Sequence, residues 1–485
     1  MTLMHKAQIL SDRHLRAWQA AYLILMSAVL YFFTSGWVYD DPYITYRYAA
    51  NLRDGVGFVY NPGERVLSTT TPLFAMLLAV LSRLWDDIPR LAVLVGCISL
   101  AAGGLALFDL AHSYRATAPG WILLLLYPLF PLLTLTLSSE TPLYLALILI
   151  SFAAYERKKY LLVGLCAALA GLARPDGILV PAILGAHFLF LRREPIPWKA
   201  VLLFLALTLA WVGFAQWYFG SPLPVTLAAK QHQGQMAAGQ TFLPGIGRVA
   251  GWYAGNPGYQ AMLGLAAVGL AGFWKANRDW WLLLGWTVAY FVGYSILGVT
   301  AYFWYYAPLV PGLVVLAAIG ITTVGQAARW ALNRMGGARL ALLAWVLPVL
   351  IALTLWAVET RSLLHAYQST DARMAVYRQA GEWLRANAAP GARIGALEIG
   401  AIGYYAQRPV VDFAGLIQPD IAAQLSPTTT YEDAAFYAIQ RYRPAFVVLI
   451  PGVFARLESS DLLQRCRKAQ SFSDRAFQVD LYDCR

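Results

Sequence analysis

Charged residues are scarce in this chain, and their scarcity excludes the commonest class of protein. Only 13% of its 485 residues are charged, whereas 59% are hydrophobic. A typical soluble domain carries about 25% charged residues, so the composition excludes a single soluble globular protein. Apolar runs of about 20 residues, the length that crosses a bilayer core as a helix, recur from residue 18 to about residue 358 and then stop. The sequence therefore predicts a polytopic α-helical membrane protein with a soluble C-terminal part.

Sequence signals of several other protein classes are also missing from the chain. The first apolar run, residues 18–36, is too long for the core of a signal peptide and lacks a small-x-small cleavage site, so we expect a retained span. The net charge of +11 comes from basic residues dispersed in short loops, which argues against nucleic acid as a partner. The chain has no Cys/His spacing typical of a metal site and no GxxxxGKS/T phosphate loop. It also has no convincing internal duplication of the kind that transporters often carry.

Cysteine is rare, with four residues in the whole chain. Cys97 and Cys166 lie in predicted spans, whereas Cys466 and Cys484 lie in the C-terminal part. An oxidising compartment permits a disulfide between the last two. Two free thiols are the alternative, because the distance between the two residues is not known from sequence.

The positions of the basic residues predict a topology. Cytoplasmic loops of membrane proteins carry an excess of Lys and Arg, and one arrangement places every short basic loop on that side. The basic residues concerned are Lys6, Arg13, Arg16, Arg115, Arg157, Lys158, Lys159, Arg192, Arg193, Lys199, Lys275, Arg278, Arg329, Arg334 and Arg339. The arrangement has about eleven transmembrane helices, near residues 18–36, 90–110, 119–138, 141–155, 160–173, 178–191, 199–219, 256–274, 280–298, 307–328 and 339–358. It predicts an integral plasma (inner) membrane protein with a cytoplasmic N-terminus and a periplasmic, extracytoplasmic C-terminal domain.

One apolar segment, Leu73 to Leu84, does not fit this arrangement as a span. Counting it would invert every later loop and place the basic loops outside. It has only about 12 residues, short for a crossing, and an acidic pair follows it, so we interpret it as an interfacial helix. The predicted domains are then a transmembrane domain over residues 1–358, with its first extracytoplasmic loop over 37–89, and a soluble α/β domain over 359–485.

The first loop begins with two adjacent carboxylates, Asp40 and Asp41. A charge near the hydrocarbon edge usually faces water or a functional cavity. Asp41 followed by Pro42 is also typical of a helix start, with Asp41 as a purely structural N-cap. If residues 42–53 are helical, Asp40, Tyr43 and Arg47 lie along one side of the helix. Asp40 is therefore the preferred catalytic carboxylate. The next segment, Gly55 to Leu67, alternates around a turn like a scaffolding hairpin.

The topology brings further polar groups to the same outer face. Glu140 stands between two apolar runs, where it either ends a solvated hairpin or holds a metal or a sugar hydroxyl. Arg174 and Asp176 form either an ion-paired turn or part of the site. Both pairs of alternatives stay open.

The later loops add cationic and aromatic candidates. Lys230 is suited to neutralise a phosphate as a point charge, although a lysine that snorkels to the interface is equally ordinary. His232 is a weaker candidate, because a lone loop histidine usually has no catalytic role. Tyr302 and Tyr305 are suited to stack on a sugar, but aromatic belts also gather at membrane interfaces without a ligand.

The C-terminal part alternates helical and strand-like segments. Ala372 to Asn387 and Tyr431 to Arg441 have helical patterns, and residues 393–397 and 446–450 have strand patterns. This predicts a small α/β domain. Residues 395–415 are rich in turns and polar groups, and they make Glu398 and Tyr404 candidates for binding substrate.

Six different motifs are distributed over most of the chain. They are residues 40–48 (DDPYITYRY), 60–65 (YNPGER), 139–143 (SETPL), 174–177 (RPDG), 222–230 (PLPVTLAAK) and 398–405 (EIGAIGYY). Together these motifs resemble the GT-C membrane glycosyltransferases that use polyprenyl-phosphate sugars, especially the bacterial arabinofuranosyltransferase-like branch. The resemblance implies an inverting transfer of a sugar, such as arabinofuranose, to an envelope glycan, lipid or protein on the extracytoplasmic side.

The resemblance also implies roles for particular residues. A first-loop aspartate, Asp40 or Asp41, would accept the proton of the acceptor hydroxyl. Arg47, Lys230 or Arg174 would stabilise the departing polyprenyl phosphate. No cofactor is required, although Asp40, Asp41 and Glu140 are hard oxygen ligands that suit magnesium, manganese or calcium.

Two other functions, one in transport and one in binding, are alternatives to the glycosyltransferase. A lipid-linked-sugar flippase or transporter is also a protein of many spans, but its ionisable groups would lie at mid-span rather than on one outer face. A non-catalytic envelope receptor would leave the acidic first loop unexplained. The pattern therefore favours an enzyme.

Overall fold

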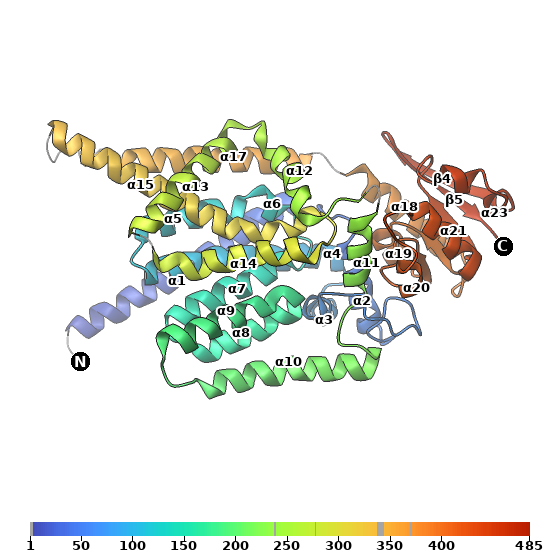
Figure 1. The fold of residues 1–485 in the computed structure, drawn as a ribbon, viewed down its shortest axis with the longest axis horizontal. Coiled ribbons are helices and arrows are strands. Elements are labelled where there is room, and N and C mark those ends of the chain that lie inside the picture. The colour runs from blue at the N-terminus through green and yellow to red at the C-terminus, as the bar shows by residue number, and fades with distance from the viewer. Residues whose placement is uncertain (1–2, 237–238, 277, 337–343, 369–370) are drawn as a thin grey trace.

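The computed structural model describes residues 3–236, 239–276, 278–336, 344–368 and 371–485. Long helices run side by side along the main axis of the molecule, and a small α/β unit covers one end of them (Figure 1). The N-terminal helix projects from the opposite end. The α/β unit is thus placed against the first loop of the chain.

The helical elements follow one another in chain order. They are α1 (Leu3–Thr34), α2 (Pro42–Arg53), α3 (Pro72–Leu81), α4 (Ile88–Ser113), α5 (Thr117–Leu126), η1 (Tyr127–Leu129), α6 (Pro131–Thr134), α7 (Thr141–Glu156), α8 (Tyr160–Ala173), η2 (Pro175–Ile178), α9 (Leu179–His187), η3 (Phe188–Arg192), α10 (Trp198–Phe219), α11 (Thr226–Gln235), α12 (Phe242–Ala254), α13 (Pro257–Ala276), η4 (Arg278–Trp280), α14 (Trp281–Leu297), η5 (Phe303–Tyr305), η6 (Ala307–Leu309), α15 (Val310–Gly336), α17 (Val346–Gln368), α18 (Ala372–Asn387), α19 (Gly400–Ala406), α20 (Pro419–Ala422), α21 (Tyr431–Tyr442), α22 (Ala455–Glu458) and α23 (Asp461–Gln464).

A helix, or a run of short helices, lies in each of the eleven predicted spans where the structure describes them. Six helical segments are long and apolar enough to cross a membrane, in α1, α4, the α9 region, α10, the α15 region and the segment that begins with α17. Several of the others, including α5, α7, α8 and α14, are apolar but shorter. The helical membrane architecture is therefore confirmed, whereas the number eleven stays a prediction. Residues 339–343 of the last predicted span, with Arg339, lie outside the described residues.

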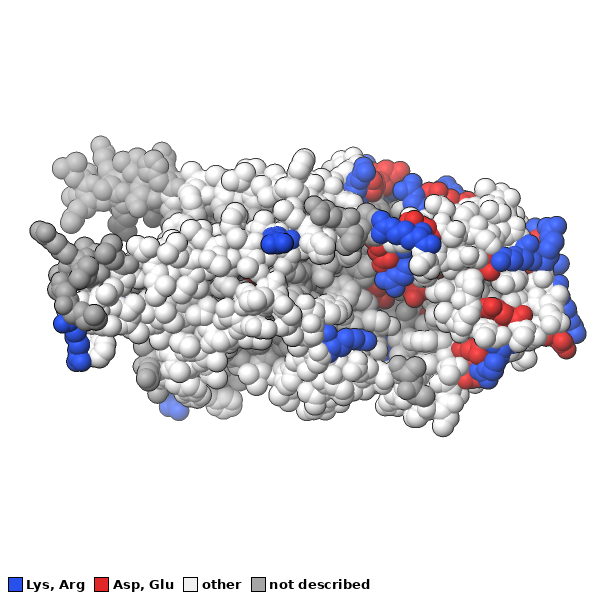
Figure 2. Space-filling model, turned by 90° about the horizontal axis from the view of Figure 1, so that it is seen from above, with Lys and Arg blue, Asp and Glu red and all other residues white. Residues whose placement is uncertain are grey.

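The surface chemistry divides the molecule into two parts. Charged side chains gather around the α/β end, whereas the helical part of the visible face is nearly free of them (Figure 2). On α10, Leu202, Leu209 and Trp217 are exposed although they are large and apolar. A band of exposed apolar side chains on a set of long helices is what a surrounding bilayer requires, and the protein is accordingly an integral membrane protein.

The first loop contains the predicted helix over residues 42–53, which is confirmed as α2. The predicted hairpin over residues 55–67 is wrong, because no strand forms there. Side chains of α2 satisfy the main-chain groups of this segment instead of a second strand. Asn51 donates to the carbonyl oxygens of Val59 and Tyr60 at 2.8 and 2.9 Å, and Tyr48 donates to that of Val66 at 2.7 Å.

The α/β unit contains a five-stranded sheet. Its strands are β1 (Ile394–Ala396), β2 (Val410–Asp412), β3 (Phe446–Leu449), β4 (Arg467–Asp474) and β5 (Phe477–Asp483), in the order β2-β1-β3-β5-β4. Strand β1 is parallel to β2 and β3, whereas β5 is antiparallel to β3 and β4. The predicted elements α18, α21, β1 and β3 are confirmed.

Cys466 and Cys484 form a disulfide that joins the start of β4 to the end of β5. Of the two alternatives left open by the sequence, the paired one is therefore found. Cys97 and Cys166 are buried free thiols in α4 and α8.

The α/β unit and the first loop share one hydrophobic core. Buried side chains of α2, such as Tyr43 and Tyr46, pack in the same cluster as Ala401 and Ile402 of α19. Because this core combines residues of the first loop with residues of the C-terminal part, the position of the first loop depends on the C-terminal part.

Candidate active site

One cavity of about 390 Å³ collects polar groups from distant parts of the chain. Its walls come from the first loop, the turn before α7, the turn after α8, α11, α14 and the aromatic segment after α14. Six of the residues predicted from the sequence line it, namely Asp41, Glu140, Arg174, Asp176, Lys230 and Tyr305.

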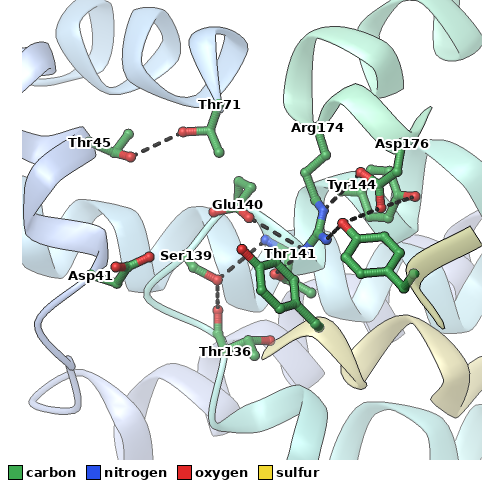
Figure 3. A network of polar contacts seen from close by, with 12 residues as sticks. Asp41, Thr45, Thr71, Thr136, Ser139, Glu140, Thr141, Tyr144, Arg174 and Asp176 are labelled. Atoms are coloured by element: carbon green, nitrogen blue, oxygen red, sulfur yellow. Dashed lines mark hydrogen bonds and ion pairs between the residues drawn. The ribbon is translucent and has the colours of Figure 1, made fainter. Parts of the chain in front are cut away.

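Arg174 is the centre of a buried charge network on one side of the cavity (Figure 3). Its side chain is only 4% exposed, and its Nε lies 3.1 Å from Asp176 Oδ1. On the other side of the guanidinium, Nη1 lies 3.7 Å from Glu140 Oε1. Nη2 donates to the hydroxyls of Tyr290 and Tyr294 at 3.3 and 2.7 Å. The turn after α8 therefore holds a cation that is enclosed by two carboxylates and two tyrosine hydroxyls.

Asp41 forms a second ion pair across the cavity. Its Oδ2 lies 3.4 Å from Nζ of Lys230, which stands on α11. The carboxylate makes no helix-capping hydrogen bond, although Asp41 occupies the N-cap position of α2. The structural alternative suggested by the sequence is thus not realised, and this carboxylate is available to the cavity.

Three aromatic rings surround the Lys230 ammonium. Nζ lies 4.7 Å from the ring centre of Tyr302, 5.3 Å from that of Trp304 and 5.7 Å from that of Tyr305. Burial opposes the charged form of Lys230, but the negative charge of Asp41 and the contacts with Asp41 and Tyr305 together outweigh it and raise the pKa of the ammonium. The site therefore keeps a fixed positive charge beside a carboxylate.

A row of hydroxyl groups in the wall was not predicted from the sequence. Thr45 and Thr71 are hydrogen-bonded to each other at 3.1 Å, and Ser68, Thr69 and Thr70 line the same wall. Four consecutive hydroxyl residues directly before Pro72 are the signal that would have found it. Such groups both donate and accept hydrogen bonds, which suits a polyhydroxylated ligand.

One side of the cavity consists of apolar residues that are also exposed on the outside of the helices. Ile178 is 54% exposed, Leu223 69%, Leu227 41% and Leu297 41%, and all four line the cavity. The charged interior thus continues to an apolar rim on the lipid-facing surface.

The two adjacent aspartates, of which the sequence favoured Asp40 as the catalytic one, have different surroundings. Asp40 does not line the cavity. Its carboxylate accepts main-chain hydrogen bonds from Gly400 at 3.0 Å and from Ala401 at 2.8 Å, at the start of α19. Gly400 has no side chain, and a Cβ there would collide with Asp40. Asp40 therefore attaches the α/β unit to the first loop, and Asp41 is the carboxylate that the cavity presents.

Several other predicted substrate-binding residues also lie away from the cavity. Arg47 is buried and donates to the carbonyl oxygens of Tyr60, Gly403 and Arg408, so its charge serves main-chain groups. The Tyr43 hydroxyl is 3.3 Å from that of Tyr405, against α19.

The remaining residues outside the cavity are His232, Tyr302, Glu398 and Tyr404. His232 Nδ1 is 2.9 Å from the carbonyl oxygen of Ala422, and the Tyr404 ring packs on those of Tyr43 and Tyr46. Tyr302 approaches the site through its contact with Lys230 and its stacking on Trp304.

Glu398 is expected to make stability depend on pH. Burial and the charge of Asp40 raise its pKa to about 8, although Arg373 lowers it. A folded-state pKa above the ordinary value of 4.5 means that the folded state binds more protons than the unfolded state between these values. The free energy of unfolding should therefore fall as pH rises through this window.

The measurement is the melting temperature of the purified protein between about pH 6.5 and pH 8. Glu398→Gln should melt at a temperature that changes less over this range than the wild type. Equal slopes for both proteins would contradict the prediction. Glu432→Gln is a matched control, because Arg456 and main-chain groups lower the pKa of Glu432 instead.

A metal site has limited support in the geometry. Among the described residues, no group of three or more His, Cys, Asp or Glu is placed to hold a metal ion. Of the three carboxylates proposed as ligands, Asp40 is bound to main-chain amides, while Asp41 and Glu140 line the cavity beside cations.

The comparisons with known proteins bear on the fold. Residues 364–482 match a family described as a domain of unknown function (DUF8728). No curated protein matches the chain. The structure resembles ArnT from Cupriavidus metallidurans bound to undecaprenyl phosphate, with 14% identity and a TM-score of 0.61 over 96% of this chain and 97% of that one.

A second similar structure is the oligosaccharyltransferase of Archaeoglobus fulgidus tethered with an acceptor peptide. Its identity is 14% and its TM-score 0.58, over 89% of this chain and 69% of that one. At such low identity the likeness concerns the fold alone. The fold is that of the GT-C membrane glycosyltransferases, as the sequence motifs indicated.

Proposed function

We propose that this protein, which has a GT-C fold, is an inverting glycosyltransferase that moves a sugar from a polyprenyl-phosphate donor to an acceptor hydroxyl. One observation carries the proposal: a single cavity joins buried carboxylates and cations to an apolar rim on exposed helix surfaces. A polyprenyl phosphate has the same two parts, a charged head and a long apolar tail. The tail would leave between Ile178, Leu223 and Leu297 into the bilayer.

Asp41 is the proposed general base. The acceptor hydroxyl would transfer its proton to the Asp41 carboxylate while its oxygen forms a bond to the anomeric carbon. The bond from that carbon to the phosphate oxygen breaks on the opposite face, and the polyprenyl phosphate leaves with the electron pair. One displacement therefore inverts the anomeric configuration.

Lys230 and Arg174 are the proposed phosphate-stabilising residues. Both are fixed on the cavity wall, so they would meet the developing negative charge without rearranging. Arg174 already has two carboxylate neighbours, whereas Lys230 has only one, Asp41. This difference makes Lys230 the better phosphate ligand. Protonation of Asp41 during transfer would also weaken the ion pair and leave the Lys230 ammonium free to bind the phosphate.

The ligand of one structural neighbour agrees with this assignment, since that ArnT structure contains undecaprenyl phosphate. The finer points are part of the proposal: arabinofuranose as a candidate sugar, an envelope glycan, lipid or protein as acceptor, and reaction on the periplasmic side of the plasma membrane. So are the cytoplasmic N-terminus and the domain boundary between residues 358 and 359.

A divalent metal would bind Asp41 and Glu140 if the reaction requires one, since both offer hard oxygen ligands. It would supply positive charge to the departing phosphate. Transfer that is unchanged in the presence of a chelator would eliminate this version of the mechanism.

The test is incubation of purified protein in lipid nanodiscs with a panel of polyprenyl-phosphate pentoses and hexoses. An enzyme releases free polyprenyl phosphate when an acceptor extract is present, and a lipid-linked-sugar flippase or transporter leaves every donor intact. If the protein moves intact donor between leaflets and releases none, the flippase is correct and the proposal is wrong.

A further inference from the structure

A second hollow of about 320 Å³ lies beside the active-site cavity. Its walls come from the end of α11 and the following loop, from α12, from the segment before η5, and from the start of α21 in the α/β unit. It therefore lies where the helical part meets the α/β unit, on the charged end of the molecule.

The floor of this hollow is held by main-chain hydrogen bonds. The amide of Ala301 donates to the carbonyl oxygen of Gln240 at 2.7 Å, and that of Phe242 donates to Val299 at 2.9 Å. The amide of Thr300 donates to Lys230 at 3.1 Å. The segment that forms the floor is thus bonded directly to the residue that carries the active-site ammonium.

A stacked pair of rings separates the hollow from the active-site cavity. Tyr302 lines the hollow and Trp304 lines the cavity, and their ring centres are 4.4 Å apart at an angle of 7°. Tyr302 donates to Gln233 Oε1 at 3.5 Å, and Tyr431 of the α/β unit lines the same hollow. The two spaces therefore lie on either side of one stacked pair of rings.

The chemistry of the lining favours a neutral, polyhydroxylated ligand. Tyr302 and Tyr431 contribute rings to the wall, Gln240 offers an amide that both donates and accepts, and Thr300 offers a hydroxyl. The Gln233 amide is already used, since it donates to the carbonyl oxygen of Ala414 at 3.2 Å and accepts from Tyr302. In the part of the chain that the structure describes, no carboxylate lines the hollow, and its one cation, Arg248, donates to the carbonyl oxygen of Ala301. Among the described residues, the Gln240 side-chain amide has no hydrogen-bond partner. A sugar ring has an apolar face for a tyrosine and a rim of hydroxyls for such amides.

We propose that this hollow binds a neutral sugar residue of the acceptor, so that the acceptor is a glycan. The proposal rests on the proposed glycosyltransferase function and specifies its second substrate. The donor head would enter from the apolar rim of the cavity, and the acceptor would enter from the aqueous side. Its reactive hydroxyl would pass the edge of the Tyr302 and Trp304 rings to reach Asp41.

The test measures binding of defined probes to the full-length protein in nanodiscs by saturation-transfer NMR. The probes are neutral trisaccharides of mannose, glucose, galactose and arabinofuranose, and a neutral hexapeptide of Gly, Ser and Thr serves as the comparison. At least one trisaccharide should bind, and Gln240→Ala and Tyr431→Ala should each weaken it about tenfold. Gln424→Ala, which removes an exposed amide of the same α/β unit outside the hollow, should have no effect.

Two outcomes overturn the proposal: no trisaccharide binds, or binding is the same in Gln240→Ala as in the wild type. Stronger binding of the hexapeptide than of any sugar points to a protein acceptor and also overturns it. Gln240 keeps the test decisive even if Tyr431→Ala does not fold, because its side-chain amide makes no hydrogen bond to another described residue. Binding of polyprenyl phosphate, measured separately, tests the proposed function, so the two failures are distinguishable.

Discussion

Replacing Asp41 by asparagine is expected to lower turnover by about 100-fold or more, because a positioned general base contributes about 10²–10⁴-fold. Asparagine has nearly the same shape but cannot accept the proton of the acceptor hydroxyl. Donor binding should change much less, since the proposed phosphate ligands Lys230 and Arg174 remain. Single-turnover transfer and direct binding of polyprenyl phosphate measure the two effects separately.

Asp40→Asn is the matched control for this experiment. Asp40 carries the same group one residue away, but both of its oxygens accept hydrogen bonds from α19. An asparagine there keeps only one acceptor oxygen, so we expect a lower melting temperature and a small loss of turnover. A large catalytic loss in Asp40→Asn together with near wild-type activity in Asp41→Asn would mean that Asp40, and not Asp41, is the general base.

Replacing Arg174 by methionine is expected to lower the free energy of unfolding by about 3–5 kcal/mol, the usual effect of removing one partner of a buried ion pair. The side chain of Arg174 is 4% exposed, and those of Asp176 and Glu140 are 10% and 15% exposed. Without the guanidinium, two enclosed carboxylates face each other with no cation between them. Thermal unfolding of the purified protein measures the loss.

Arg157→Met tests whether burial is the cause. Arg157 also pairs with an aspartate, Asp109, at 2.9 Å, but both side chains are more exposed, at 34% and 26%. Such exposed pairs contribute about 0–1 kcal/mol to the free energy of unfolding. The melting temperature of Arg157→Met should therefore change little. Adding Asp176→Asn to Arg174→Met should recover part of the stability. If the two arginine variants lose equal stability, the burial argument fails.

The elements that depend on local pattern were predictable from the sequence. Hydropathy alone located the long helices, and Asp41-Pro42 with the apolar stripe behind it located α2. The distribution of basic loops predicted that Glu140, Arg174 and Lys230 share one face, and all three line the cavity. The helix signals succeed because the residues that produce them lie within a few helical turns of one another.

The failures have a common physical cause, which is contact between residues distant in the chain. The choice between Asp40 and Asp41 depends on where α19 lies, and α19 begins at Gly400, 360 positions later. Arg47 donates to carbonyl oxygens of Gly403 in the same remote helix, of Arg408 just after it, and of Tyr60 in the first loop, instead of binding a ligand. Residues 55–67 have the alternation of a hairpin, but side chains from α2 satisfy the carbonyl oxygens that a second strand would have bonded.

The bonds from Asp40 to the start of α19 have a consequence for biosynthesis. The ribosome completes the helical part of the chain long before it translates the segment that fixes the first loop. Newly inserted protein would therefore pass through an immature, inactive stage, although nearly every cavity-lining side chain is already present. Maturation would coincide with folding of the α/β unit onto the first loop, because only then do the amides of Gly400 and Ala401 hold the residue next to Asp41.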